Sequence, residues 1–243
     1  MPDGMSHRWG IEMRILVAMT LAAGATSAGA GPAEYAFRWD PTQGGPGSAA
    51  AVVVALKLQP GKSKKYVVRY FDVVQPTTVP PGYKVIGRER GAPGEKPDAT
   101  YKVRGPEPIP SELLAWKCPL TGVSESKAEV DVGFVGVSLP KRAFSVSCTV
   151  DKAALQPVLP AGYSATAKGC SSQMERTKAR SSKVELKVEQ WSLPKGEVAI
   201  EVSMEGSDSD ADLERFRAEV VNPLLSKKAV PLKGSKSELG SEC

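Results

Sequence analysis

Alternation of polar and apolar residues is the strongest pattern along this chain. In the segment EYAFRW, residues 34–39, Glu34, Ala36 and Arg38 share one face while three aromatic residues share the other. Side chains two positions apart lie on the same face of a β-strand, so this pattern predicts a strand. Similar alternation predicts four more strands, at 127–132 (KAEVDV), 143–150 (AFSVSCTV), 183–191 (KVELKVEQW) and 197–204 (EVAIEVSM).

Residues 64–74 (KKYVVRYFDVV) are apolar on both faces except for Arg69 and Asp72, which predicts a central strand. Residues 88–105 (RERGAPGEKPDATYKVRG) predict two further strands, because a turn rich in Gly and Pro separates two pairs of cations with strand spacing. These pairs are Arg88 with Arg90, and Lys102 with Arg104.

Helices are expected at only three places. The segment 209–228 begins with capping candidates and carries apolar residues at helical spacing. Residues 151–158 predict a short helix that opens with Asp151. The segment 47–58 is ambiguous, because its valines favour a strand while Ser48 and its alanines favour a helix, and we interpret it as a helix.

The N-terminal residues 1–30 have the pattern of a signal peptide. Two arginines precede a short apolar run, and the segment ends in Ala28-Gly29-Ala30. The run is shorter than the ~20 residues of a membrane-spanning helix. We therefore expect cleavage after Ala30, secretion or a periplasmic location, no membrane span, and a single domain at 31–243.

The remaining composition excludes several classes of site. The only histidine, His7, lies in the expected signal peptide, so the exported chain has no histidine for a catalytic triad or a zinc site. A net charge of +5 is too small to indicate a nucleic-acid partner. The four cysteines suggest up to two disulfides in an oxidising compartment, and their spacing leads us to expect Cys148 to pair with Cys170 rather than with Cys118 or Cys243.

Strands with one charged face can form an open sheet whose charges face solvent, or a closed barrel whose charges face a lumen. The distribution of charge favours the barrel. Cations concentrate on the earlier strands, whereas carboxylates concentrate on the later ones, and a lumen that holds an anion and a divalent metal needs both. The later acids are Glu129, Asp131, Glu185, Glu189 and Glu201. An open β-sandwich that serves as an interaction module remains the alternative.

At these same residues the chain resembles the CYTH domain, or triphosphate tunnel metalloenzyme, family. EYAFR is similar to the family's opening ExExK strand, and RYFD (69–72) is similar to its YFDT segment. IGRERG and ATYKVRG resemble its paired basic strands, and VEQWSLPKGEVAIEVS (188–203) resembles the hairpin that carries an ExE metal strand. The resemblance extends to a late basic position at Lys236.

The resemblance implies an α+β fold in which mainly antiparallel strands, about eight of them, close into a tunnel-like barrel with a few covering helices. It implies binding of a phosphate-chain anion such as polyphosphate or triphosphate, and hydrolysis with Mg²⁺ or Mn²⁺. The expected anion-binding residues are Arg38, Arg69, Arg88, Arg90, Lys102 and Arg104. The expected metal ligands are Glu34, Glu189 and Glu201.

The chain departs from the family pattern at two metal-binding positions. Ala36 and Ser203 stand where the resemblance implies a second carboxylate on each of two strands. Divalent hard cations need several oxygen ligands, so the loss weakens the expected metal site. A non-catalytic envelope protein that keeps the barrel without its metal site is therefore the alternative function.

Overall fold

The computed structural model describes residues 31–76, 78–106, 108, 118–135 and 140–243. The expected signal peptide lies outside the described residues. Among these residues no helix is long and apolar enough to cross a membrane. Nine strands make up the sheet: β1 (Pro32–Trp39), β2 (Gln59–Val74), β3 (Lys84–Gly91), β4 (Asp98–Gly105), β5 (Glu125–Phe134), β6 (Pro140–Val150), β7 (Ser164–Arg180), β8 (Glu185–Ser192) and β9 (Val198–Ser207).

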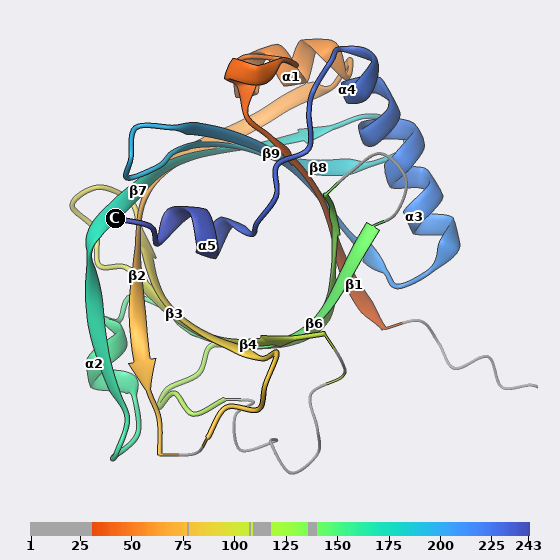
Figure 1. Ribbon diagram of the computed structural model, residues 1–243. Helices are drawn as coiled ribbons and strands as arrows, with labels where there is room; N and C mark the ends of the chain where they lie inside the picture. The colour runs from red at the N-terminus through yellow and green to blue at the C-terminus, as the bar shows by residue number, and fades with distance from the viewer. Residues whose placement is uncertain (1–30, 77, 107, 109–117, 136–139) are drawn as a thin grey trace, which may run out of the picture.

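The nine strands close into one barrel in the order β1-β5-β6-β4-β3-β2-β7-β8-β9 (Figure 1). The pairing is antiparallel throughout except between β1 and β5, which run parallel. This confirms the tunnel-like barrel, and the strand expected to be central, β2, lies between β3 and β7. The hairpin expected after residue 191 joins β8 to β9, where Leu193 and Glu197 close the turn.

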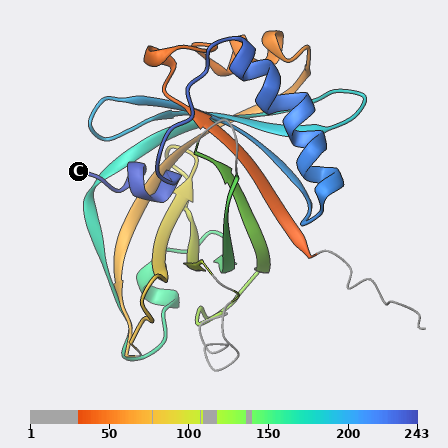
Figure 2. The same cartoon turned by 45° about the vertical axis from the view of Figure 1, so that its right-hand side comes forward.

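Helices cover part of the outside of the barrel (Figures 1 and 2). These are α1 (Ala49–Ala55), α2 (Leu155–Val158), α3 (Asp210–Phe216), a π-helical segment (Arg217–Val221) and α4 (Asn222–Ser226), and a further helix, α5 (Lys236–Gly240), lies at one mouth. The ambiguous segment 47–58 contains α1, whose N-cap Ser48 accepts a hydrogen bond from Ala51 N at 3.1 Å. The helix expected at 151–158 is shorter than predicted and begins at Leu155.

Most strands turn their apolar face outward, beneath these helices, whereas a smaller apolar cluster around Tyr70 and Trp191 faces the lumen. Tyr35, Phe37 and Trp39 of β1 are fully buried in a cluster with Phe216 and Leu224 from the covering helices. A second cluster packs Tyr101 and Cys148 under Leu155 of α2. Burial of this surface stabilises the barrel from outside and leaves the polar faces of the strands for the lumen.

Two disulfides join Cys118 to Cys148 and Cys170 to Cys243. The expected pairing of Cys148 with Cys170 is therefore wrong. Cys148 lies on β6 and Cys170 on β7, and three strands separate β6 from β7 around the barrel. Disulfides persist in oxidising compartments, so both bonds favour an extracellular or otherwise oxidising environment.

Candidate functional site in the lumen of the barrel

Two cations of β3 lie inside the lumen without a carboxylate partner. Arg88 donates from Nη2 to Thr100 Oγ1 at 3.2 Å, and the Arg90 guanidinium lies over the Tyr66 ring at 5.3 Å. The Nε atoms of both arginines are buried without a hydrogen-bond partner, and neither side chain makes an ion pair with any described residue. Burial, together with the charges of Arg88 and Arg176, lowers the pKa of Arg90 to about 10. No carboxylate of the described residues therefore neutralises these two guanidinium groups by direct contact.

The cations of β4 face the same lumen but are paired with acids of β5. Arg104 donates from Nε to Asp131 Oδ2 at 2.7 Å, and Lys102 Nζ lies 3.2 Å from the same oxygen. Lys102 also lies 3.5 Å from Glu129, whose other oxygen is 2.6 Å from Lys127 Nζ. Burial alone would raise the pKa of Asp131, but the positive charges of Lys102 and Arg104 outweigh it and lower that pKa.

Glu189 and Glu201 form a second charged group, and both are almost completely buried, at 1% and 0% exposure. Glu189 of β8 accepts from Arg176 Nη2 at 2.6 Å and from Trp191 Nε1 at 3.0 Å. Glu201 of β9 pairs with Arg38 of β1. Burial by itself would raise the pKa of Glu189, but Lys236 and Arg176 outweigh that effect and hold it well below its usual range.

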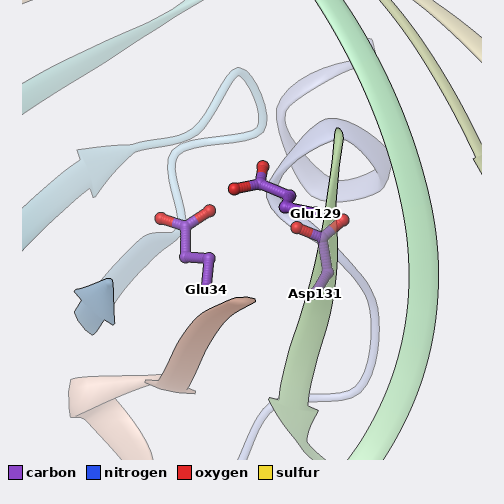
Figure 3. A group of neighbouring side chains, drawn as sticks. All are labelled: Glu34, Glu129 and Asp131. Carbon is purple, nitrogen blue, oxygen red and sulfur yellow. The ribbon is translucent and has the colours of Figure 1, made fainter. Parts of the chain in front are cut away.

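A group of three carboxylates lies on β1 and β5. Oxygens of Glu34, Glu129 and Asp131 come within 4.8 Å of one another, and Figure 3 shows the three side chains pointing toward a common space. Glu34 makes no ion pair within the described residues, unlike the other two acids. Burial opposes the charged form of Glu34, but Lys236 and Lys102 outweigh it and lower its pKa. Charged carboxylate oxygens that converge in this way fit a hard cation such as Mg²⁺ or Mn²⁺.

The structure divides the three expected metal ligands between two places. Glu34 belongs to the group with Glu129 and Asp131, whereas Glu189 and Glu201 are cross-strand neighbours that share the ammonium of Lys236. The sequence placed Glu129 and Asp131 among the later acids but did not assign them to the metal. Their adjacency to Glu34 depends on the parallel β1–β5 pairing, which joins segments almost a hundred residues apart and has no local signal.

Of the six expected anion-binding residues, Arg69 lies on the wrong face of the sheet. Arg69 lies opposite Glu89 in the register of β2 with β3. The Glu89 carboxylate accepts a hydrogen bond from Leu155 N of α2, outside the barrel. Arg69 is exposed, whereas its neighbours Val68 and Tyr70 are buried in the lumen. Because side chains alternate along a strand, Tyr70 rather than Arg69 shares the face of Arg88. The other five residues face the lumen.

Cations outnumber carboxylates in the central lumen. Among the described residues the cations are Arg38, Arg88, Arg90, Lys102, Arg104, Lys127, Arg176 and Lys236, and the carboxylates are Glu34, Glu129, Asp131, Glu189, Glu201 and the more exposed Glu205, a second partner of Lys127. The excess of positive charge lies inside a low-dielectric enclosure, where an anion would relieve the repulsion. Lys127, Arg176 and Lys236 were not among the anion-binding residues expected from the sequence.

A cavity of about 240 Å³ opens at the mouth beside α5. Its wall includes Glu34, Arg38, Arg104 and Lys236, together with the small residues Ala36 and Gly133, which pair across β1 and β5. A Cβ atom at Gly133 would meet no other atom within 4 Å. The lumen therefore has room for a ligand between its acidic and basic walls.

Comparison with known proteins identifies no family for this chain. No protein-family model matches the chain, and no curated protein matches it. Among solved structures, a protein of Pyrococcus horikoshii shares 12% identity over 85% of this chain and 97% of its own, with a TM-score of 0.44. A candidate adenylate cyclase from Vibrio parahaemolyticus shares 13% identity over 86% of this chain and 98% of its own, with a TM-score of 0.48.

Proposed function

We propose that the barrel binds a phosphate-chain anion, such as polyphosphate or triphosphate, inside its lumen. The observation that carries this proposal is the pair Arg88 and Arg90, two half-buried guanidinium groups whose Nε atoms are buried and which have no carboxylate partner among the described residues. Guanidinium groups form strong charge-assisted hydrogen bonds with phosphate oxygens. Arg38 and Arg104 line the cavity beside α5, and Lys102 contacts the same Asp131 as Arg104 does. Each of these three cations is paired with an acid in the structure.

A chain of phosphates fits this distribution of charge better than a single phosphate does. The lumen offers cations at successive positions, on β3, β4 and β1, rather than one compact cradle. The resemblance to the CYTH family at the same strands supports the same ligand class. The two disulfides and the signal-peptide pattern of residues 1–30 favour a secreted or periplasmic protein, so the ligand is expected to be an anion that occurs outside the cytoplasm.

The probe for this function is inorganic tripolyphosphate, titrated calorimetrically into the disulfide-bonded chain 31–243 without divalent metal. We expect saturable binding that is stronger than binding of orthophosphate and weakens as salt rises, because the contacts are between charges. Binding of neither anion at low salt would overturn the proposal.

Metal-assisted hydrolysis of the same anion is a second candidate, favoured by the unpaired carboxylate of Glu34 beside Glu129 and Asp131. These three residues would hold Mg²⁺ or Mn²⁺, which supplies positive charge to phosphoryl oxygens when bound. Release of orthophosphate from tripolyphosphate with either metal, lost in Glu34→Ala, would establish hydrolysis. Binding without release would favour the non-catalytic envelope protein.

A further inference from the structure

The side chain of Lys236 extends from α5 to the two most deeply buried acids of the lumen. Its Nζ lies 2.5 Å from Glu201 Oε1 and 3.1 Å from Glu189 Oε2. The same ammonium lies 6.0 Å from the centre of the Trp191 ring. One cation therefore bridges carboxylates of two neighbouring strands, β8 and β9, which is the position that a bridging divalent ion would take.

The segment that carries Lys236 is fixed to the barrel by several independent contacts. Ser235 and Glu238 form a capping box at the start of α5, and Glu238 also pairs with Lys84 of β3. Leu239 packs against the apolar cluster of Tyr70 and Trp191. Cys243, just beyond the helix, is bonded to Cys170 of β7. Both views of the barrel show α5 beside β2, which it contacts (Figures 1 and 2). The ammonium is therefore held in place rather than free to leave.

Glu189 and Glu201 are the carboxylates that pair with the Lys236 ammonium among the described residues, and two carboxylates can hold a divalent ion once no cation lies between them. Ala36 of β1 and Ser203 of β9 are cross-strand neighbours, so the two positions without a carboxylate lie side by side. Arg38 and Arg176 already pair with Glu201 and Glu189, respectively. A divalent ion at these acids would have to displace Lys236 or lie against it, at a severe electrostatic cost.

We propose that Lys236 is a built-in counter-cation that occupies the place of a divalent metal between Glu189 and Glu201. While α5 is docked, these two acids do not bind Mg²⁺ or Mn²⁺. Removal of the ammonium converts them into a divalent-cation site. The inference concerns the protein without phosphate, so it stands or falls independently of the proposed anion binding.

The test is calorimetric titration of Mn²⁺ into metal-free protein, without phosphate, for the wild type and for Lys236→Met. The methionine keeps the length of the side chain and removes its charge. We expect Lys236→Met to bind one Mn²⁺ more per chain than the wild type, or to bind Mn²⁺ at least about tenfold more tightly. The same uptake in both proteins would overturn the inference.

Three further variants make the result specific. Lys233→Met removes an exposed lysine from the same segment and should leave Mn²⁺ uptake at the wild-type level. Lys236→Arg keeps the charge and should show no gain. The gain should disappear in Lys236→Met/Glu201→Gln. The inference would be contradicted if Mn²⁺ binding still increased in Lys236→Met/Glu201→Gln. It would also be contradicted if Lys233→Met increased Mn²⁺ binding as much as Lys236→Met does.

If circular dichroism shows that Lys236→Met is unfolded, Lys236→Gln replaces it, because the amide can still donate a hydrogen bond to one of the acids. The same outcome is expected for the glutamine variant: extra or tighter Mn²⁺ binding that depends on Glu201. If the glutamine variant is folded and binds Mn²⁺ as the wild type does, Lys236 does not take the place of the metal.

Discussion

The double variant Arg88→Ala/Arg90→Ala is expected to bind tripolyphosphate at least about a hundredfold more weakly than the wild type. Each guanidinium can give a charge-assisted hydrogen bond worth about 1.5–3 kcal/mol, and the loss of two such bonds amounts to at least that factor in Kd. The effect is large because no described acid competes with the ligand for these two groups. Calorimetric titration at low salt measures it.

Arg69→Ala is the matched control, because Arg69 lies on the neighbouring strand but faces outward and is exposed. Tripolyphosphate affinity should stay within about threefold of the wild type in this control, since distant surface charges are screened. The double variant should also unfold at a urea concentration no lower than the wild type does, because Arg88 and Arg90 repel each other. If Arg69→Ala and the double variant lost the same amount of affinity for tripolyphosphate, the lumen would not be the binding site for this anion.

Glu189→Ala is expected to lower the free energy of unfolding by about 3 kcal/mol or more, the typical cost of removing one partner of a buried ion pair. The variant leaves Arg176 and Lys236 facing each other in the lumen without the carboxylate that both contact. It also removes the acceptor of the Trp191 indole N–H. Urea denaturation at neutral pH measures the change.

Glu185→Ala serves as the control on the same strand. Glu185 is exposed, and its removal should change the unfolding free energy by no more than about 0.5 kcal/mol. If Glu189→Ala lowered the free energy of unfolding as little as Glu185→Ala does, then water rather than Glu189 would stabilise the charges of the lumen cations.

Much of the fold could be predicted because the chain repeats one local rule. Glu34 and Tyr35 belong to opposite faces whatever the global fold, since the pleat of a strand separates neighbours. Once several such strands follow one another, apolar faces need cover and charged faces need solvent or a lumen. Helix α1 also followed from local chemistry, through the capping hydroxyl of Ser48.

The parts that could not be predicted depend on contacts between distant segments. The alternation along β2 requires Arg69 and Tyr70 to face opposite sides of the sheet. Which of the two faces inward depends on β3, where Tyr70 lies opposite Arg88 of the lumen and the outward-facing Glu89 binds α2. Cysteine spacing carries no information about which strands are neighbours, so the pairing of Cys148 was wrong. The separation of Glu34 from Glu201 follows from the register of β1 with β9, in which Arg38 rather than Glu34 lies opposite Glu201.

The most direct measurement of the central claim is a crystal structure of the chain 31–243 with tripolyphosphate. The account predicts phosphate oxygens within hydrogen-bonding distance of the Arg88 and Arg90 guanidiniums, inside the barrel and without contact to Arg69. Density for tripolyphosphate only on the outer surface, with Arg88 and Arg90 in contact with water alone at saturating ligand, would contradict it.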